Sequence, residues 1–341
     1  MHDLHIHLGG AVPSSVLWET LCDNGLQTEY QNFDSFHESL TANARDVKSL
    51  DDFLGRYFQL TEEIQSSPSA ANVSAYQVVA KAYRRARVQS LELRFNPHKR
   101  VRSGLHTMDA IILAVLQGLE KASLHYGVAT GIILSLGRDL PIESNWQIVE
   151  AAIKWKSHGS LNGANGVVGI DMAGLESRSL ELRESWLAEI ASMFHRARKA
   201  GLKLTYHVGE SQGTGPEAML RVIEALQPDR IGHGVELRNA DGKLKQHLIK
   251  LLRTQSICLE ICPSVNLVTR VVPDYRTIAD LIRELAREQI PYCINTDNPY
   301  LIHTNLRREH DLIHQELGSD GDALIALAQE HARSHSFLKL S

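Results

Sequence analysis

The chain has 341 residues, 43% of them hydrophobic, and a formal net charge of −4. Its Lys and Arg residues are spread out rather than gathered in a basic stripe, which argues against nucleic-acid binding. No apolar run approaches the length of a membrane span, and the N-terminus lacks a signal-peptide pattern. The four cysteines do not form a disulfide framework, so we expect a cytoplasmic protein.

Short segments rich in Val, Ile and Leu recur along the chain, bounded by Gly, Pro or Asn, and they predict β-strands. The predicted strands are residues 3–8, 89–95, 128–135, 166–171, 202–207, 229–233, 256–261 and 291–296. Amphipathic segments with a helical period lie between many of them. The predicted helices are residues 72–87, with Asn72 as the N-cap, and residues 107–125, 179–200, 216–226 and 275–288. This alternation predicts parallel strands with helical crossovers, and eight such strands predict a closed (β/α)₈ barrel. An open doubly wound sheet is the alternative.

Residues 10–88 form a long excursion after the first predicted strand. They contain helical patches near 13–25 and 46–66. Because the loops that follow the strands build the site in such a barrel, we expect this helical insertion to cover the site. No linker or internal repeat divides the chain, so residues 1–341 are predicted to form one domain.

Two histidines lie one residue apart in the first predicted strand. Side chains alternate between the two faces of a strand, so His5 and His7 project to the same side. That spacing suits two imidazoles that bind one divalent metal. A pair of this kind also arises by chance on a polar strand end, so the pair alone does not establish a metal site.

Later predicted strands also end in polar residues. His207 ends one of them, with Glu210 three residues on, and His233 lies between two glycines at the end of the next. Asp297 follows the last predicted strand. The carboxyl ends of barrel strands converge at one mouth, so these residues should surround a common cavity together with the first two histidines.

These residue types suit a catalytic metal centre. Three imidazoles and the Asp297 carboxylate can bind a divalent ion and leave a position open for water, whose pKa the metal lowers. His233 is then free to take the proton of the water, and Glu210 can protonate the electrophile or leaving group. Each residue alone could instead be a satisfied core histidine, a helix cap or a turn residue. Nitrogen and oxygen ligands also leave zinc, iron and manganese open.

Several segments together resemble the adenosine deaminase family of metal-dependent barrel hydrolases. They are DLHIHLGGAVP, SLDDFLGRYF, LELRFNPH, GIDMAGLE, HVGE, RIGHG, LEICPSVN and INTDNP, in the order of the family, from Asp3 to Pro299. The resemblance implies a (β/α)₈ barrel with one zinc ion per chain. The implied zinc ligands are His5, His7, His207 and Asp297.

The resemblance also implies catalytic roles. Glu210 would donate a proton to purine N1, and His233 would orient or deprotonate the attacking water with the help of Asp297. Hydroxide would add to C6 of an aminopurine, and ammonia would leave. The backbone N–H of Gly174 would bind purine N3, and an apolar wall would cover the substrate. The residues expected to contact substrate are His7, Gly174, Asn298, Phe53 and Leu54, with Leu50 and Phe58 in the same wall.

Two positions depart from the pattern of the family. Adenosine-active members commonly have Asp, and adenine-active members Glu, where this chain has Gly9. Glycine cannot hydrogen-bond a sugar and leaves space, so either another residue binds the sugar or the substrate is larger at that end, such as a 5′-modified adenosine. Asn298 stands where the family often has a second Asp near purine N7, and its amide can donate to an unprotonated N7.

We therefore expect a hydrolase of C–N bonds in cyclic amidines, with a small-molecule purine as its partner. It would convert the C6 amino group of adenosine or a 5′-modified adenosine to the 6-oxo form and release ammonia. A deaminase of another heterocycle, such as adenine or a pterin, and a non-catalytic relative are the alternatives. The sequence leaves the oligomeric state open.

Overall fold

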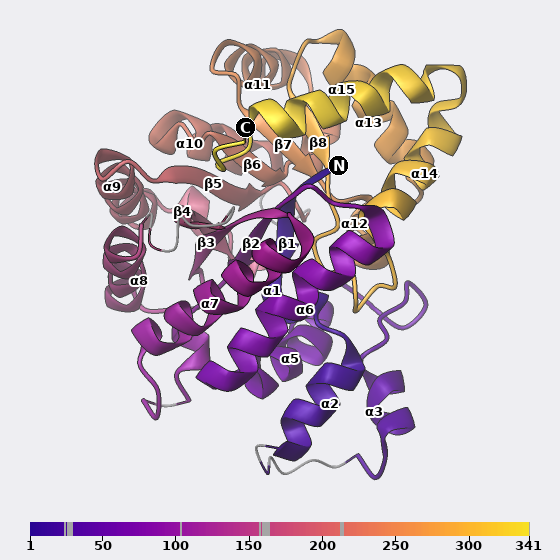
Figure 1. Ribbon diagram of the computed structural model, residues 1–341. Coiled ribbons are helices and arrows are strands. Elements are labelled where there is room, and N and C mark those ends of the chain that lie inside the picture. The colour runs from indigo at the N-terminus through magenta and orange to yellow at the C-terminus, as the bar shows by residue number, and fades with distance from the viewer. Residues whose placement is uncertain are drawn as a thin grey trace.

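In the computed structural model, eight parallel strands form one sheet in the order β1 to β8, with helices around it (Figure 1). The structure describes residues 1–341 except 24, 26–29, 103, 157, 159–163, 212–214 and 341. The strands are β1 (His2–His7), β2 (Ser90–Phe95), β3 (Ala129–Gly137), β4 (Ala164–Ala173), β5 (Lys203–Val208), β6 (Arg230–His233), β7 (Cys258–Ile261) and β8 (Tyr292–Ile294). Each predicted strand corresponds to one of these, with small shifts at the ends.

The barrel closes between β1 and the segment that follows β8. The backbone N–H of His7 donates to the carbonyl of Asp297, and the N–H of Asp297 donates to the carbonyl of His5, both at 2.8 Å. These bonds make Ile6 and Asp297 a parallel bridge pair. The predicted (β/α)₈ barrel is therefore confirmed, and the closure brings Asp297 beside the two histidines of β1.

The outer helices follow the strands along the chain. They are α7 (Met108–Tyr126), α8 (Ile142–Lys154), α9 (Glu184–Lys199), α10 (Gly215–Leu226), α11 (Gly242–Thr254), α12 (Pro263–Val268), α13 (Tyr275–Arg287), α14 (Leu306–Leu317) and α15 (Gly321–Ser334). The predicted helix over 179–200 begins only at Glu184. Ser179 has a φ of +47° and separates two short 3₁₀ turns, and this left-handed residue interrupts the helical pattern.

Helix α6 (Pro68–Ala86) begins before the predicted cap. The Ser67 hydroxyl accepts a hydrogen bond from the N–H of Ala70, and Pro68 occupies the first turn, where it needs no donor. Asn72 lies inside the helix, where its side-chain amide donates to the carbonyl of Ala114 on α7 at 3.0 Å. The prediction of Asn72 as the N-cap is therefore wrong.

Among the described residues, six helical segments, most of them short, lie between β1 and α6. They are α1 (Leu8–Ala11), α2 (Ser14–Asp23), α3 (Phe33–Ser39), α4 (Leu50–Phe53), a π-helical turn (Leu54–Phe58) and α5 (Gln59–Ile64), followed by α6. Helices α2 and α3 lie at one end of the molecule, and α5 lies between them and the barrel (Figure 1). The two helical patches expected near 13–25 and 46–66 correspond to α2 and to the α4–α5 segment. Position 24 of the first patch lies outside the described residues.

A network of buried charges fills the barrel below the strand ends. Arg230 pairs with Glu92 and with Glu260, each at 2.6 Å, and Arg94 pairs with Glu260 at 2.8 Å. All four side chains are fully buried. Such charges require matched partners, and here each of them has one.

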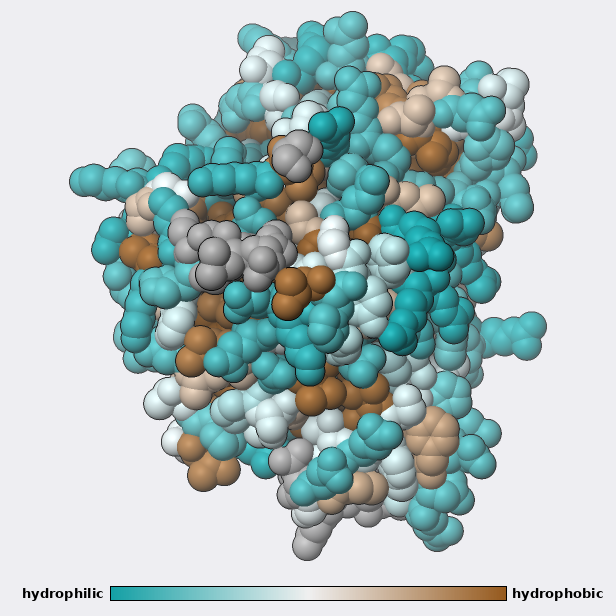
Figure 2. Space-filling view, in the orientation of Figure 1, coloured by the Kyte–Doolittle hydropathy of each residue, from teal (hydrophilic) through white to brown (hydrophobic). Residues whose placement is uncertain are grey.

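The visible surface is mostly hydrophilic, with apolar side chains in small separate groups (Figure 2). Within the described part of the chain, no helix is both long enough and apolar enough to span a membrane.

Candidate metal centre and active site

The ends of β1 and β5 bring three imidazoles together. One ring nitrogen from each of His5, His7 and His207 lies within 4.8 Å of the others, and the Nε2 atoms of His7 and His207 are 3.2 Å apart. Asp297 Oδ1 lies 3.6 Å from His7 Nε2 and 3.9 Å from His5 Nε2. The four residues expected to bind metal therefore share one buried centre.

Carboxylates behind the centre orient two of the rings. His5 Nδ1 donates to Glu260 at 2.7 Å, and His207 Nδ1 donates to Asp171 at 2.9 Å. A ring that donates from Nδ1 keeps Nε2 free of hydrogen and available to a metal. Burial lowers the pKa of His5 and of His207 well below the ordinary value, so both rings are neutral.

The donor atoms of the centre fit a divalent cation. His5 Nε2 is buried and has no hydrogen-bond partner among the described residues, which is costly unless the atom binds something else. Burial raises the pKa of Asp297 to about 8, and a cation at this position would favour the carboxylate form. Cys262 lies in an overlapping group with His5, His233 and Asp297, but burial raises the pKa of its thiol, so it remains a neutral neighbour.

His233 and Glu210 lie next to this centre. His233 Nε2 is 3.7 Å from Asp297 Oδ2 and 3.5 Å from Glu210 Oε1. Both His233 and Asp297 have positive φ values, +62° and +59°, which non-glycine residues adopt mainly where the fold demands it. Burial lowers the pKa of His233, so its imidazole is neutral.

Glu210 has the character of a proton donor. Burial raises its pKa well above the ordinary value, and the carboxylates of Asp297 and Glu176 raise it further, which favours the protonated form of the side chain. The carboxylate of Glu176 holds the segment after β5 in place. It accepts hydrogen bonds from the N–H groups of Glu210 and Ser211, at 3.1 and 2.7 Å.

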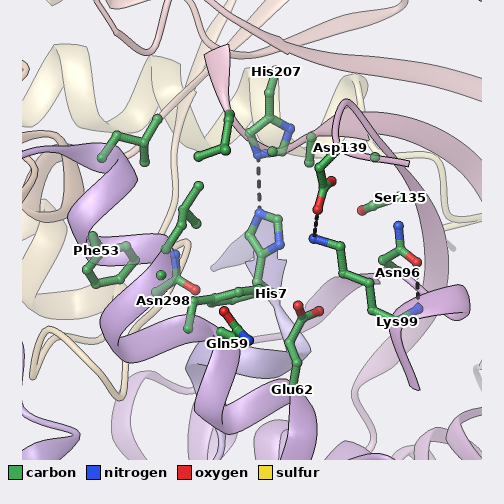
Figure 3. Close-up of a pocket in the computed structure, with 18 of the residues that line it drawn as sticks. His7, Phe53, Gln59, Glu62, Asn96, Lys99, Ser135, Asp139, His207 and Asn298 are labelled. Atoms are coloured by element: carbon green, nitrogen blue, oxygen red, sulfur yellow. Dashed lines mark hydrogen bonds and ion pairs between the residues drawn. The ribbon is translucent and has the colours of Figure 1, made fainter. Parts of the chain in front are cut away.

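A cavity of about 540 Å³ opens from this centre (Figure 3). Its lining includes all five residues that we expected to contact substrate: His7, Phe53, Leu54, Gly174 and Asn298. Arg138 supports Gly174, because its guanidinium donates to the Gly174 carbonyl at 3.0 Å. The Asn298 amide donates to Asp297 Oδ1 at 2.5 Å, so one of its two N–H groups is already engaged.

Gly9 does not open the cavity as we expected. A Cβ atom at this position would lie 2.8 Å from Cζ of Phe58 and 3.3 Å from Oγ1 of Thr61. The ring of Phe58 therefore already occupies the space beside Gly9. The interpretation that Gly9 leaves room for a larger substrate is wrong, because a residue 49 positions away fills that room.

Sequence reasoning missed several residues of the site. It missed three buried carboxylates that hold His207, His5 and the backbone of Glu210 in place, namely Asp171, Glu260 and Glu176. It also missed a separate set of polar residues that lines the cavity. That set is Gln59, Glu62, Asn96, Lys99, Ser135 and Asp139. The available signal was a charged residue inside an apolar strand, as at Asp171 and Glu260, since such a residue needs a buried partner.

The adenosine deaminase family model matches residues 1–340. The chain belongs to the adenosine deaminase family. The resemblance noted from its motifs is confirmed, and the chain is a deaminase, a hydrolase of C–N bonds.

Two adenosine deaminases are similar to this chain over most of its length. An adenosine deaminase of Clostridium perfringens (strain ATCC 13124) is 28% identical over 319 residues, which cover 93% of this chain and 88% of the relative. An adenosine deaminase of Clostridium botulinum (strain 657) is 27% identical over 320 residues, with the same coverage of both proteins.

Solved structures share the fold. The N6-mAMP deaminase MAPDA of arabidopsis has a TM-score of 0.78 at 25% identity, covering 99% of this chain and 93% of that one. An amidohydrolase from Burkholderia ambifaria with bound Zn has a TM-score of 0.78 at 20% identity, covering 99% and 85%. The adenine deaminase of Arthrobacter aurescens has a TM-score of 0.75 at 17% identity, covering 97% and 98%.

Proposed function

We propose that this member of the adenosine deaminase family is a zinc-dependent aminohydrolase. It converts the C6 amino group of an adenine-containing substrate, adenosine or a 5′-modified adenosine, to the 6-oxo form and releases ammonia. The observation that carries the proposal is the convergence of three imidazole nitrogens within 4.8 Å, beside the buried acid Glu210. The cavity of about 540 Å³ lies within the usual range for small-molecule sites.

One zinc ion per chain would be held by His5, His7, His207 and Asp297. The unpartnered Nε2 of His5 and the carboxylates behind two of the rings support this assignment. When bound, zinc supplies an acidic water and hence hydroxide near neutral pH.

The side chains of the protein move and hold protons. Glu210, whose pKa is raised by burial, donates a proton to N1 of the purine and makes C6 more electrophilic. The neutral imidazole of His233, 3.7 Å from Asp297, orients the attacking water and accepts its proton. The amino group takes the proton held by His233 and leaves as ammonia when the C6–N bond breaks, and the remaining hydroxyl proton returns to Glu210 as the 6-oxo group forms.

Other residues bind and orient the purine ring. The Gly174 N–H donates to N3, and the second amide N–H of Asn298 donates to N7. His7 lies beside the substrate, and Phe53 and Leu54 cover it from the segment 10–88. We propose that this segment acts as the cover within a single domain of residues 1–341.

We also propose a cytoplasmic location. Cys258, Cys262 and Cys293 are buried free thiols, and the Sγ atoms of Cys258 and Cys293 are 3.9 Å apart. Buried thiols so close together suit a reducing compartment.

The test is an ultraviolet assay that follows conversion of an adenine ring to a hypoxanthine ring. Adenosine, adenine, 5′-methylthioadenosine and a pterin are compared on protein whose metal content has been measured. We expect close to one zinc per chain and turnover of at least one nucleoside, with activity lost to a chelator and restored by zinc. Turnover of the pterin alone, or activity that is indifferent to the metal, would contradict the proposal.

A further inference from the structure

A second cavity, of about 470 Å³, lies behind β1, and we call it the rear cavity. Ile6, which lines it, points away from His5 and His7 because side chains alternate along a strand. Other lining residues come from α6, from α14 and from the segment between β8 and α14, and the two helices contact one another (Figure 1). Among the described residues, none lines both this cavity and the substrate cavity. The proposed function therefore makes no use of the rear cavity.

Three cationic side chains line the rear cavity. Lys81 and Arg85 lie one turn apart on α6, and Arg308 belongs to α14. None of the three forms an ion pair with another described residue. Like charges at this helical spacing repel one another, and the third cation adds to the repulsion. An anion bound in the cavity would relieve it.

The rear cavity has little negative charge of its own. Asp3 is the one acid in its lining within the described part of the chain, and that side chain is 1% exposed. Its two oxygens accept hydrogen bonds from Thr296, at 2.6 Å from the hydroxyl and 3.4 Å from the backbone N–H. Asp3 thus joins the first strand to the segment after β8, and one such carboxylate does not balance three cations.

The cations of the rear cavity act on one another. Lys81 is partly buried, with Nζ 4.8 Å from the centre of the Tyr300 ring. Burial lowers the pKa of Lys81, and the charge of Arg85 lowers it further. Burial also lowers the pKa of His303 in the same lining, and neighbouring charges that include Arg308 and Lys81 add to this effect. Cationic groups from both helices therefore lie close enough to share one ligand.

The lining of the rear cavity suits a phosphate group on an apolar body. A guanidinium donates two parallel hydrogen bonds to phosphate oxygens, and a lysine ammonium adds a point charge. The volume of the cavity lies within the usual range for small-molecule sites, so a phosphate ion alone would leave most of it unfilled. The rest of the lining is largely apolar and includes Val78, Ala82, Val88, Pro299, Tyr300 and Leu306.

We infer that the rear cavity binds the phosphate group of a small phosphomonoester, whose organic part packs on the apolar lining. Arg85 and Arg308 hold the phosphate from two helices, and Lys81 adds its charge. This second site goes beyond the proposed deamination and does not rest on it. Because Ile6 is part of its wall, the bound molecule contacts the strand that carries two of the proposed zinc ligands.

Isothermal titration calorimetry of the full-length protein with phenyl phosphate tests the inference. Inorganic phosphate and benzoate are compared at the same ionic strength, because salt screens exposed charges. Phenyl phosphate should bind more tightly than either, since phosphate lacks the apolar body and benzoate carries a single charge.

Two double variants remove the same number of charges at neighbouring positions. Arg85→Gln with Arg308→Gln should weaken phenyl phosphate binding by roughly 10- to 100-fold, because charged hydrogen bonds are lost. Arg84→Gln with Arg307→Gln is the matched control and should keep the wild-type affinity, since neither residue lines the cavity. Arg84 instead donates to the hydroxyl of Tyr126 at 2.7 Å. All four arginines are exposed, so both variants should fold.

The outcomes separate a built site from charge alone. An equal loss of affinity in the two double variants would show that only net charge attracts the anion. Unchanged affinity in both would place the anion elsewhere, for example at the metal centre. Either result, or no binding of phenyl phosphate to the wild-type protein, would overturn the inference. Failure of the proposed function would instead appear as absent deamination, which this binding measurement does not read.

Discussion

The ring of Phe58 packs against Gly9, where a Cβ atom would stand only 2.8 Å from Cζ of the ring. The same ring lies edge-on to the imidazole of His7, with 5.8 Å between the ring centroids. Phe58 thus links the helical segment before β2 to a residue of the metal centre, and Gly9 is the residue that permits the contact.

Gly9→Ala should destabilise the protein by about 1–3 kcal/mol, because the added methyl group overpacks the contact with Phe58. Gly9 lies in α1, where alanine is the better helix former, so helix propensity alone would make the variant more stable. A loss of stability would therefore come from the contact with Phe58. Urea unfolding measures it. The double variant Gly9→Ala with Phe58→Leu should recover most of the loss. Gly55→Ala, whose Cβ would meet nothing within 4 Å, is the control.

Glu210→Gln should retain zinc and lose about 10²- to 10⁴-fold in kcat, since an amide cannot donate the proton that a carboxylic acid supplies. Metal analysis alongside steady-state kinetics checks both parts. Loss of zinc in this variant would show that Glu210 is a ligand.

Asp171→Ala should weaken zinc binding by about 10- to 100-fold, because His207 loses the carboxylate that orients its ring at 2.9 Å. Competition with a chromophoric chelator measures the affinity. Asp280→Ala removes an exposed carboxylate from α13 and should leave the affinity unchanged. Equal affinities of the two variants would contradict the role of Asp171.

Arg230→Met should cost about 3–5 kcal/mol of folding free energy, since among the described residues it leaves the buried Glu92 without an ion-pair partner and Glu260 with Arg94 alone. Arg196→Met breaks an exposed pair with Glu150 and should cost less than about 1 kcal/mol. Chemical denaturation of the two variants gives the comparison, and similar losses would show that the buried network contributes little.

Protonation of His310 should account for part of the fall in the free energy of unfolding at acid pH. Burial, aided by the N-terminal ammonium, lowers its pKa to about 4 from an ordinary value of 6.5. The folded state therefore favours the neutral ring, and this contribution is complete above pH 6.5 and lost as the pH falls toward 4. The shift corresponds to about 3 kcal/mol at most.

His310→Gln should accordingly reduce the loss of stability between pH 7 and pH 4.5. Both proteins are compared without metal, so that loss of zinc in acid does not contribute. An identical drop in the two proteins would show that His310 does not titrate on unfolding.

Much of the site could be predicted because it depends on local rules. Side chains alternate along a strand, so His5 and His7 share a side wherever the strand lies. The ends of parallel strands converge, so His207, His233 and Asp297 could be assigned to one mouth before any contact was known. Helix starts were less predictable, as Asn72 shows, since several polar residues near Pro68 compete to be the cap.

The amino-acid sequence by itself determined the eight strands, their parallel order and the residues at their ends, because periodicity and composition act over a few neighbouring positions. Only the tertiary structure decided which distant groups meet. His5 contacts Glu260, which lies 255 residues away in the chain, and Phe58 packs against Gly9. Residues of α5 and of the segments after β2 and β3 line one cavity. Such contacts depend on how the whole barrel packs, and a pattern of neighbouring residues cannot predict them.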